Sequence, residues 1–124
     1  MAGTLTYNTT LANVGYIYRA TGGGVTFSAN LAGSTTFDYF TDTAVVNDAL
    51  YIGRTAVSTY TLWSDVTFNI GTAIAGTGIT GVWEYYKGAT LGWVALEKYV
   101  DNTNGFTTTG AQRLQFGYQN SWTA

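Results

Sequence analysis

Two glutamates are the residues whose types and spacing come closest to catalytic chemistry. Glu84 and Glu97 fall on neighbouring predicted strands, and Trp83, Tyr86 and Trp93 stand near them in the sequence. A glycosidase uses two carboxyl groups about 5–9 Å apart, one of them with a raised pKa. The simpler interpretation makes Glu84 one polar position in an aromatic strand and Glu97 a solvated strand end. We favour this interpretation, because the spacing of the two residues carries little signal of its own.

The remaining composition narrows the chemistry further. The chain has no His and no Cys, so it cannot supply a histidine base, a thiolate nucleophile, a disulfide or a typical zinc site. The stretch 101–105 is similar to the start of a calcium loop, but Gln112 stands where the bidentate Glu belongs, which favours a turn held by Asp and Asn side chains. The triple glycine 22–24 lacks the Lys-Ser or Lys-Thr of a phosphate loop and predicts a flexible joint. We therefore expect no enzyme and no cofactor or metal.

The aromatic residues support two interpretations. Exposed on one sheet, they would form a stacking platform for a sugar, and the candidates are Trp63, Trp83, Trp93 and Trp122 with Tyr85, Tyr86 and Tyr99. Otherwise they fill the core of a sandwich or anchor a subunit contact, where Trp and Tyr are enriched. We favour the core and contact interpretation and keep the carbohydrate-binding module as an alternative.

Charge is scarce in this chain of 124 residues, with 5 basic and 7 acidic residues making up 10% of it. An ordinary soluble domain carries about 25% charged residues. A net charge of −2 argues against a nucleic-acid partner. No apolar run has the roughly 18 residues of a membrane span, and the first residues do not have the pattern of a signal peptide, so we expect no membrane association. The absence of Pro leaves sheet edges unguarded, which favours a subunit that works inside an assembly.

From residue 36 onward, short segments of β propensity recur between Gly, Asn and Asp turns, as in a sandwich or barrel. The clearest alternation runs along 62–70. We predict strands at 36–40, 49–53, 62–70, 80–87, 93–97 and 112–118 in an all-β antiparallel sandwich over residues 36–124. The predicted core comprises Tyr51, Leu62, Val66, Phe68, Trp83, Tyr85, Trp93, Leu96, Phe106, Leu114 and Phe116.

Residues 1–35 differ from the rest of the chain. They are rich in Thr, Asn and Gly and hold a single charge, Arg19. With little apolar surface to bury, they are not expected to fold alone. We predict an extended N-terminal arm that orders on neighbouring subunits, with short strand-like pieces at 14–18 and 25–27. Its predicted assembly contacts are Leu5, Tyr7, Leu11, Tyr16, Tyr18 and Phe27.

Several stretches between residues 40 and 122 follow a common pattern. They are 40–53, then 80–88 with its Trp-Glu-Tyr-aromatic-x-Gly strand and turn, then the Trp-x-x-Leu strand 93–96, and finally 101–110. This pattern resembles jelly-roll-like β domains of tailed-bacteriophage virion structural proteins, which include capsid decoration proteins and baseplate or fibre components. The resemblance implies a jelly-roll topology, no catalytic activity, and a function in trimer contacts, contacts to the capsid or tail lattice and sometimes glycan binding.

We therefore expect a virion structural protein, made in the host cytoplasm. The leading hypothesis is a capsid decoration, or cement, protein that binds and stabilises the capsid lattice through its arm and subunit contacts. Its expected partners are copies of itself, as a trimer, and the major capsid protein. A tail, baseplate or fibre component is the first alternative. A carbohydrate-binding module, which would need two or three coplanar exposed rings, is the second.

Overall fold

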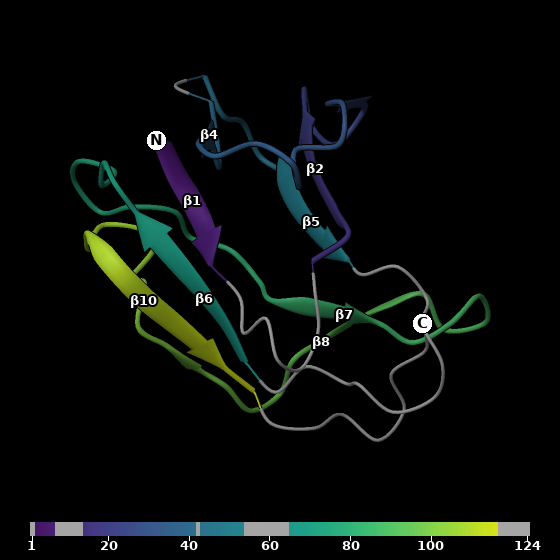
Figure 1. Ribbon diagram of the computed structural model, residues 1–124. Coiled ribbons are helices and arrows are strands. Elements are labelled where there is room, and N and C mark those ends of the chain that lie inside the picture. The colour runs from purple at the N-terminus through teal and green to yellow at the C-terminus, as the bar shows by residue number, and fades with distance from the viewer. Residues whose placement is uncertain (1, 7–13, 42, 54–64, 117–124) are drawn as a thin grey trace.

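The computed structural model describes residues 2–6, 14–41, 43–53 and 65–116. Within these ranges the protein is all-β, with strands in three antiparallel sheets and no helix (Figure 1). The five-stranded sheet has the order β4 (Phe37–Asp38), β1 (Ala2–Thr6), β6 (Asp65–Ile70), β10 (Gly110–Gln115) and β9 (Val100–Asp101). The three-stranded sheet has the order β3 (Thr26–Phe27), β2 (Tyr16–Thr21) and β5 (Ala49–Gly53). A hairpin pairs β7 (Glu84–Tyr86) with β8 (Trp93–Ala95).

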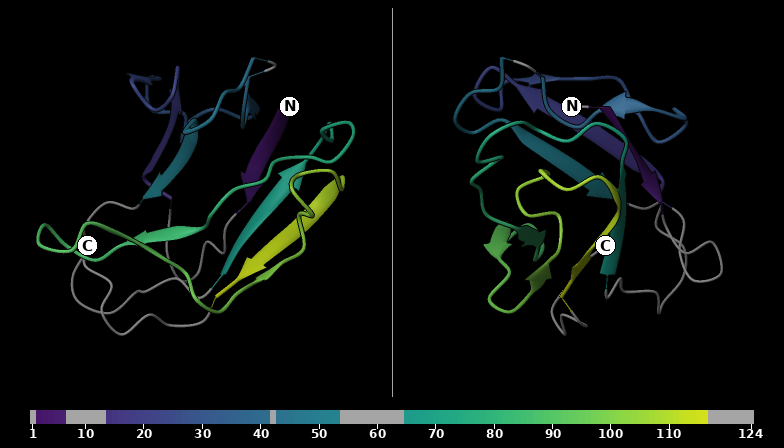
Figure 2. Two further views of the ribbon diagram at one scale, coloured as in Figure 1. Left: turned by 180° about the vertical axis from the view of Figure 1, so that it is seen from behind. Right: turned by 90° about the vertical axis from the view of Figure 1, so that its left-hand side faces the viewer.

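The two larger sheets form separate layers, as Figure 2 shows from two further directions. The all-β antiparallel class predicted from the sequence is confirmed. This strand order does not show the jelly-roll topology that the resemblance implies. In the described part of the chain, no helix is long and apolar enough to cross a membrane.

Strands β6 and β10 show why the core forms where it does. Val66, Phe68 and Ile70 alternate along β6 and are all buried, while Asn69 between them is exposed. Antiparallel pairing places Leu114 of β10 opposite Val66, on the same face, and Leu114 is also buried. A period of two in apolar residues on neighbouring strands therefore builds one continuous apolar face.

The core is largely aromatic at its centre. The ring of Phe68 lies 5.8 Å from Tyr39, 5.2 Å from Phe106 and 5.8 Å from Trp83, measured between centroids. Ile17 of β2 is buried in the same cluster, so both larger sheets contribute to one core. The buried members of this cluster are Val14, Ile17, Tyr39, Val66, Phe68, Ile70, Tyr85, Leu96, Phe106, Leu114 and Phe116.

The structure does not show the extended arm that we predicted, because the described N-terminal strands are paired within the two larger sheets. Strand β1 lies between β4 and β6 in the five-stranded sheet, with Leu5 opposite Phe68. Strand β2 pairs with both β3 and β5, and its residues Ile17 and Ala20 are 3% and 0% exposed. The prediction weighed only the scarcity of large apolar side chains. Ladder hydrogen bonds come from the main chain, so a Thr- and Gly-rich segment can pair as well as an apolar one.

The strand boundaries differ modestly from the predicted ones. Strand β5 spans the predicted 49–53, whereas β4, β7 and β8 are shorter than 36–40, 80–87 and 93–97. Strand β10 begins two residues before the predicted start, at Gly110. The candidates Leu62, Tyr7 and Leu11, together with Trp63 and Trp122, lie outside the described residues.

Tyr39 makes the stability of the fold sensitive to alkaline pH. Its side chain is fully buried, its hydroxyl donates to the Asn69 carbonyl oxygen at 3.2 Å, and burial raises the pKa of its phenol above the ordinary value. Above about pH 10 the unfolded chain releases this proton while the folded protein retains it. The free energy of unfolding should therefore fall with rising pH there, by up to about 1.4 kcal/mol per pH unit from this group. Urea unfolding at about pH 8, 10 and 11 measures this loss of unfolding free energy, because these values lie on both sides of the ordinary Tyr pKa.

Tyr39→Phe is the matched variant for this prediction. It should cost about 1 kcal/mol at neutral pH, because it removes the hydrogen bond from the Tyr39 hydroxyl to the Asn69 carbonyl oxygen. It should also flatten the alkaline loss of stability. An unchanged alkaline slope in the variant would show that other groups cause the loss.

Candidate functional site

The structure places the two candidate glutamates in and just after the β7–β8 hairpin. Glu84 lies on β7 opposite Ala95, and both Glu84 and Glu97 are exposed. In the described part of the chain, no group of three or more Asp and Glu residues could hold a metal ion.

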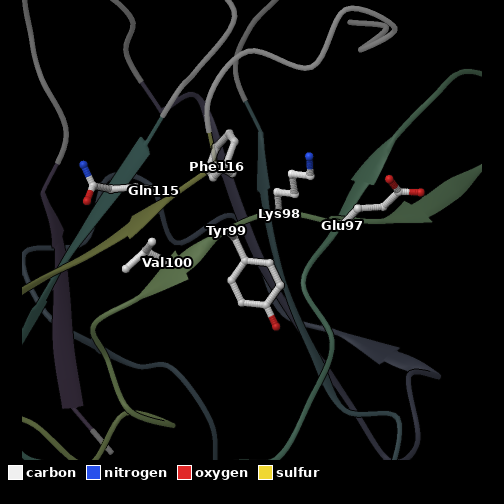
Figure 3. Close-up of a pocket in the computed structure, with 6 residues that line it drawn as sticks. All are labelled: Glu97, Lys98, Tyr99, Val100, Gln115 and Phe116. Atoms are coloured by element: carbon white, nitrogen blue, oxygen red, sulfur yellow. The ribbon is translucent and has the colours of Figure 1, made fainter.

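Glu97 instead lines an open hollow of about 500 Å³ at the edge of the five-stranded sheet. Its other lining residues are Lys98, Tyr99, Val100, Gln115 and Phe116 (Figure 3). The close-up shows the carboxylate of Glu97, the amine of Lys98 and the phenol of Tyr99 pointing in different directions. The hollow therefore lacks the convergent polar groups of a small-molecule site.

The 101–105 stretch is a turn locked by its own side chains, as the favoured interpretation expected. The Asp101 carboxylate accepts from the Thr103 main-chain N at 2.8 Å, from the Thr103 hydroxyl at 2.6 Å and from the Trp83 indole N at 2.9 Å. Thr103 is fully buried, and its hydroxyl accepts from the Phe106 main-chain N at 3.4 Å. The Asp101 carboxylate therefore has a structural role. Because Trp83 directly precedes β7, these hydrogen bonds connect the start of the hairpin to the turn before β10.

The triple glycine also has a structural role. Gly22, Gly23 and Gly24 have φ values of 65°, 78° and 85°, a conformation that glycine adopts without strain. The Gly23 main-chain N donates to one Asp48 carboxylate oxygen at 2.9 Å, and the Val45 main-chain N donates to the other at 3.1 Å. Asp48 thus joins two loops at one end of the three-stranded sheet. The glycines form a hydrogen-bonded turn there, in contrast to the flexible joint that we predicted.

Several aromatic rings form one surface, and sequence reasoning named most of its members without placing them together. Tyr16, Tyr18 and Phe27 were predicted contacts, and Tyr86 and Trp93 were platform candidates. Cross-strand pairing places Tyr18 of β2 opposite Tyr51 of β5. The Tyr51 ring lies 5.7 Å from Phe27 and 5.3 Å from Trp93, and the Trp93 ring lies 5.4 Å from Tyr86. Tyr16 and Tyr18 lie two residues apart on the same strand face, with ring centroids 6.2 Å apart. We call this surface the aromatic face; its residues are Tyr16, Tyr18, Phe27, Tyr51, Tyr86 and Trp93.

The aromatic face is open to solvent because the opposite face of the same sheet supplies the core. On that opposite face Ile17 is buried, and Leu50 and Ile52 are packed against the core cluster. On the aromatic face Phe27 is 58% exposed, Trp93 46% and Tyr16 43%. Half-exposed large rings gathered on one side are uncommon on the surface of a monomer and mark interaction sites.

Two predicted core residues, Tyr51 and Trp93, belong to this surface. Trp93 is 46% exposed and Tyr51 is half-buried, so neither lies in the core. Strand β5 carries apolar residues on both faces, so its pattern does not say which face is buried. Of the other platform candidates, Tyr85 is buried, Trp83 packs against the core, and Tyr99 is 43% exposed at the hollow, away from the aromatic face.

The chemistry of the aromatic face is apolar and uncharged. Its six residues are Tyr, Phe and Trp, so it includes no Asp, Glu, Lys or Arg side chain. Arg19 points to the opposite side of β2, where its guanidinium donates to the Asp38 carbonyl oxygen at 2.8 Å. Such a face can bind by burying ring area and by hydrogen bonds from Tyr and Trp.

No protein-family model matches the chain, and no curated protein or solved structure is significantly similar to it. The resemblance to phage virion domains accordingly stands on the sequence motifs alone.

Proposed function

We propose that this protein is a non-enzymatic structural subunit of a tailed-bacteriophage virion, and specifically a capsid decoration protein that attaches through its aromatic face. The observation that carries the attachment surface is the exposure of Phe27, Trp93 and Tyr16 on one side of the molecule. The virion assignment comes from the motifs between residues 40 and 122. Attachment is assigned to this face in place of an arm, because β1 and β2 are paired within the sheets of this chain.

The composition of the face supports a role in protein association. Interface cores are enriched in Trp, Tyr and Phe and depleted of charged residues. Three rings that each carry about 150–250 Å² of surface, roughly half of it open, leave on the order of 300 Å² of apolar area uncovered. That area is too small for a whole stable interface, which takes about 800 Å² per partner, but it is enough for the central part of one.

The ring geometry distinguishes this proposal from carbohydrate binding. A sugar-binding platform needs coplanar rings with open faces, whereas Tyr51 and Trp93 meet at 65°, Tyr86 and Trp93 at 57°, and Phe27 and Tyr51 at 41°. Tyr16 and Tyr18 are close to parallel at 13°, with ring centroids 6.2 Å apart, but the rings beside them on the aromatic face are tilted. The rings thus form a ridged surface suited to interdigitation with another protein.

Co-sedimentation with undecorated capsids tests the proposal. Attachment by apolar area should survive an increase in salt from about 0.05 to 1 M, because salt screens exposed charge pairs but leaves apolar contacts intact. Phe27→Ser and Trp93→Ser should each weaken attachment by roughly tenfold, as the loss of a hot-spot ring does. Tyr99→Ser is the matched control, because Tyr99 is as exposed as Tyr16 but lies outside the aromatic face.

Three results would count against the proposal. Release of the intact protein at high salt would show that charge pairs dominate attachment. Equal losses for Phe27→Ser and Tyr99→Ser would show that the aromatic face is not the contact. Binding to tails or fibres in place of capsids would move the protein to the first alternative within the virion.

A further inference from the structure

Strand β5 forms an edge of the three-stranded sheet. Its only strand neighbour among the described residues is β2, and the sheet order is β3-β2-β5. Such an edge exposes the main-chain N–H and C=O groups of every second residue.

The contacts of β2 identify which residues of β5 face outward. On the β3 side, the Leu31 main-chain N donates to the Ile17 carbonyl at 2.8 Å, and the Ser28 main-chain N donates to the Arg19 carbonyl at 2.9 Å. Main-chain groups of successive residues in a strand point to opposite sides. The main-chain groups of the even-numbered residues of β2 therefore point toward β5. Tyr18 is one of them, and its partner on β5 is Tyr51. The main-chain groups of Leu50 and Ile52, which alternate with Tyr51, therefore point to the side of β5 on which no other described strand lies.

Nothing within β5 itself guards that edge. Its five residues include no Pro and no charged side chain, the two commonest devices against edge pairing. All five residues of the strand are half-buried. No other described strand pairs with its outer edge.

We propose that β5 pairs antiparallel with β5 of a second copy of this chain, about a two-fold axis that passes through Tyr51. In this register Leu50 of each copy lies opposite Ile52 of the other, and each of these two residue pairs exchanges two hydrogen bonds. Registers centred on Leu50 or Ile52 would leave one of the outward-facing residues unpaired. The two three-stranded sheets become one continuous sheet across the axis.

A second copy is the fitting occupant because the edge is complementary to itself. Antiparallel strand pairing is symmetric about a two-fold axis, so one edge supplies both sides of an isologous contact. The strand itself adds no charge repulsion to such a contact, because none of its five residues is charged.

The proposed contact extends the aromatic face across the two-fold axis. Tyr51 and Trp93 form a T-shaped pair at 5.3 Å, and the axis would place a second such pair next to the first. One short strand pairing covers less than the roughly 800 Å² per partner of a standard interface, so the dimer should be reversible, with a dissociation constant of roughly micromolar order. The inference concerns the sheet edge and does not rest on the virion assignment; capsid binding can fail while the dimer stands.

Charge reversal at the axis provides the sharpest test. Tyr51→Lys places two like charges directly opposite one another, as does Tyr51→Glu, so each variant alone should dimerise about tenfold more weakly than the wild type. An equimolar mixture of the two variants should recover a dimer that contains one copy of each. Sedimentation velocity from about 1 to 100 µM measures the association, because this range covers the expected micromolar dissociation constant. Native mass spectrometry identifies the mixed dimer.

Tyr18→Lys is the matched control. Tyr18 lies opposite Tyr51 on the same face, but on the interior strand of the sheet, so the same charge change there should leave the dimer intact. Dimerisation that is unaffected by the Tyr51 variants, or lost equally in Tyr18→Lys, would overturn the proposed register. A wild-type protein that stays monomeric, or that forms a trimer, would overturn the proposal itself.

Hydrogen exchange on the wild-type chain tests the pairing of β5 with a second copy even if the Tyr51 variants fail to fold. The amides of Leu50 and Ile52 should become more protected as protein concentration rises through the dimer transition. The amide of Tyr51, which is bonded to β2 in either state, should change little. Equal exchange at Leu50 and Ile52 at low and high concentration would contradict edge pairing.

Discussion

Replacing Phe68 with alanine is expected to lower the free energy of unfolding by about 3–5 kcal/mol, the range for a fully buried large ring. Phe68 is 0% exposed and contacts Tyr39, Trp83 and Phe106. The cavity would open among rings that come from three separate segments, just after β4, just before β7 and in the turn before β10, so little of it can close by relaxation. Urea unfolding followed by tryptophan fluorescence measures the change.

Trp93→Ala is the matched comparison for Phe68→Ala. It removes a larger ring, but that ring is 46% exposed and packs on Tyr51 and Tyr86 of the aromatic face. We expect a loss of about 1–2 kcal/mol, since roughly half of the ring area is buried. A larger loss for Trp93→Ala than for Phe68→Ala would mean that the core is centred on the hairpin.

The contrast between these two residues shows what the sequence pattern could predict. Along β6, buried Val66, Phe68 and Ile70 alternate with polar residues, so the buried face follows directly from the period of two. Strand β5 offers no such contrast, because Tyr51 lies between two aliphatic residues. Only the partner strand decides which of its faces is covered, and that information is not local.

The N-terminal strands illustrate a second limit of sequence reasoning. Residues 2–6 contain little apolar area, yet they pair with β6 over four residues and with β4 over two. Side-chain composition predicts burial but says little about main-chain pairing, which every residue except Pro can provide. Five of the six residues of the aromatic face were predicted contacts or platform candidates, but their gathering on one surface was not predicted. Its rings come from β2, β3, β5 and the hairpin, and only the fold brings these segments together.

The hydrogen bonds within the 101–105 turn, by contrast, could be predicted from the local sequence. Asp101 and Thr103 stand two residues apart, the spacing at which an Asp side chain accepts from the main chain ahead of it, and the structure shows this bond at 2.8 Å. Its link to Trp83 at 2.9 Å spans 18 positions and could not be predicted. Local hydrogen bonds follow from spacing, whereas the contacts that fix the turn in the fold depend on the arrangement of the sheets.

Gly78→Ala is expected to destabilise the protein by about 3 kcal/mol or more, through both backbone strain and overlap. Gly78 has a φ of 73°, where an L side chain costs about 1–2 kcal/mol. A Cβ atom there would also overlap the Gly105 carbonyl oxygen and lie 2.7 Å from the Thr107 methyl group. The Ile79 main-chain N donates to that same carbonyl at 3.0 Å, so the two loops cannot separate without breaking a hydrogen bond.

Gly76→Ala separates the two causes, because it carries the strain without the overlap. Gly76 has a φ of 79° in the same loop, and a Cβ there would meet nothing within 4 Å. It should therefore cost only the strain, about 1–2 kcal/mol, and the difference between the two variants measures the close approach of the loop to Gly105. Because Phe106 follows Gly105 and packs on Phe68 at 5.2 Å, a displaced Gly105 would disturb the core directly. Equal losses for the two variants in urea unfolding would mean that the loops do not meet as closely as the structure has them.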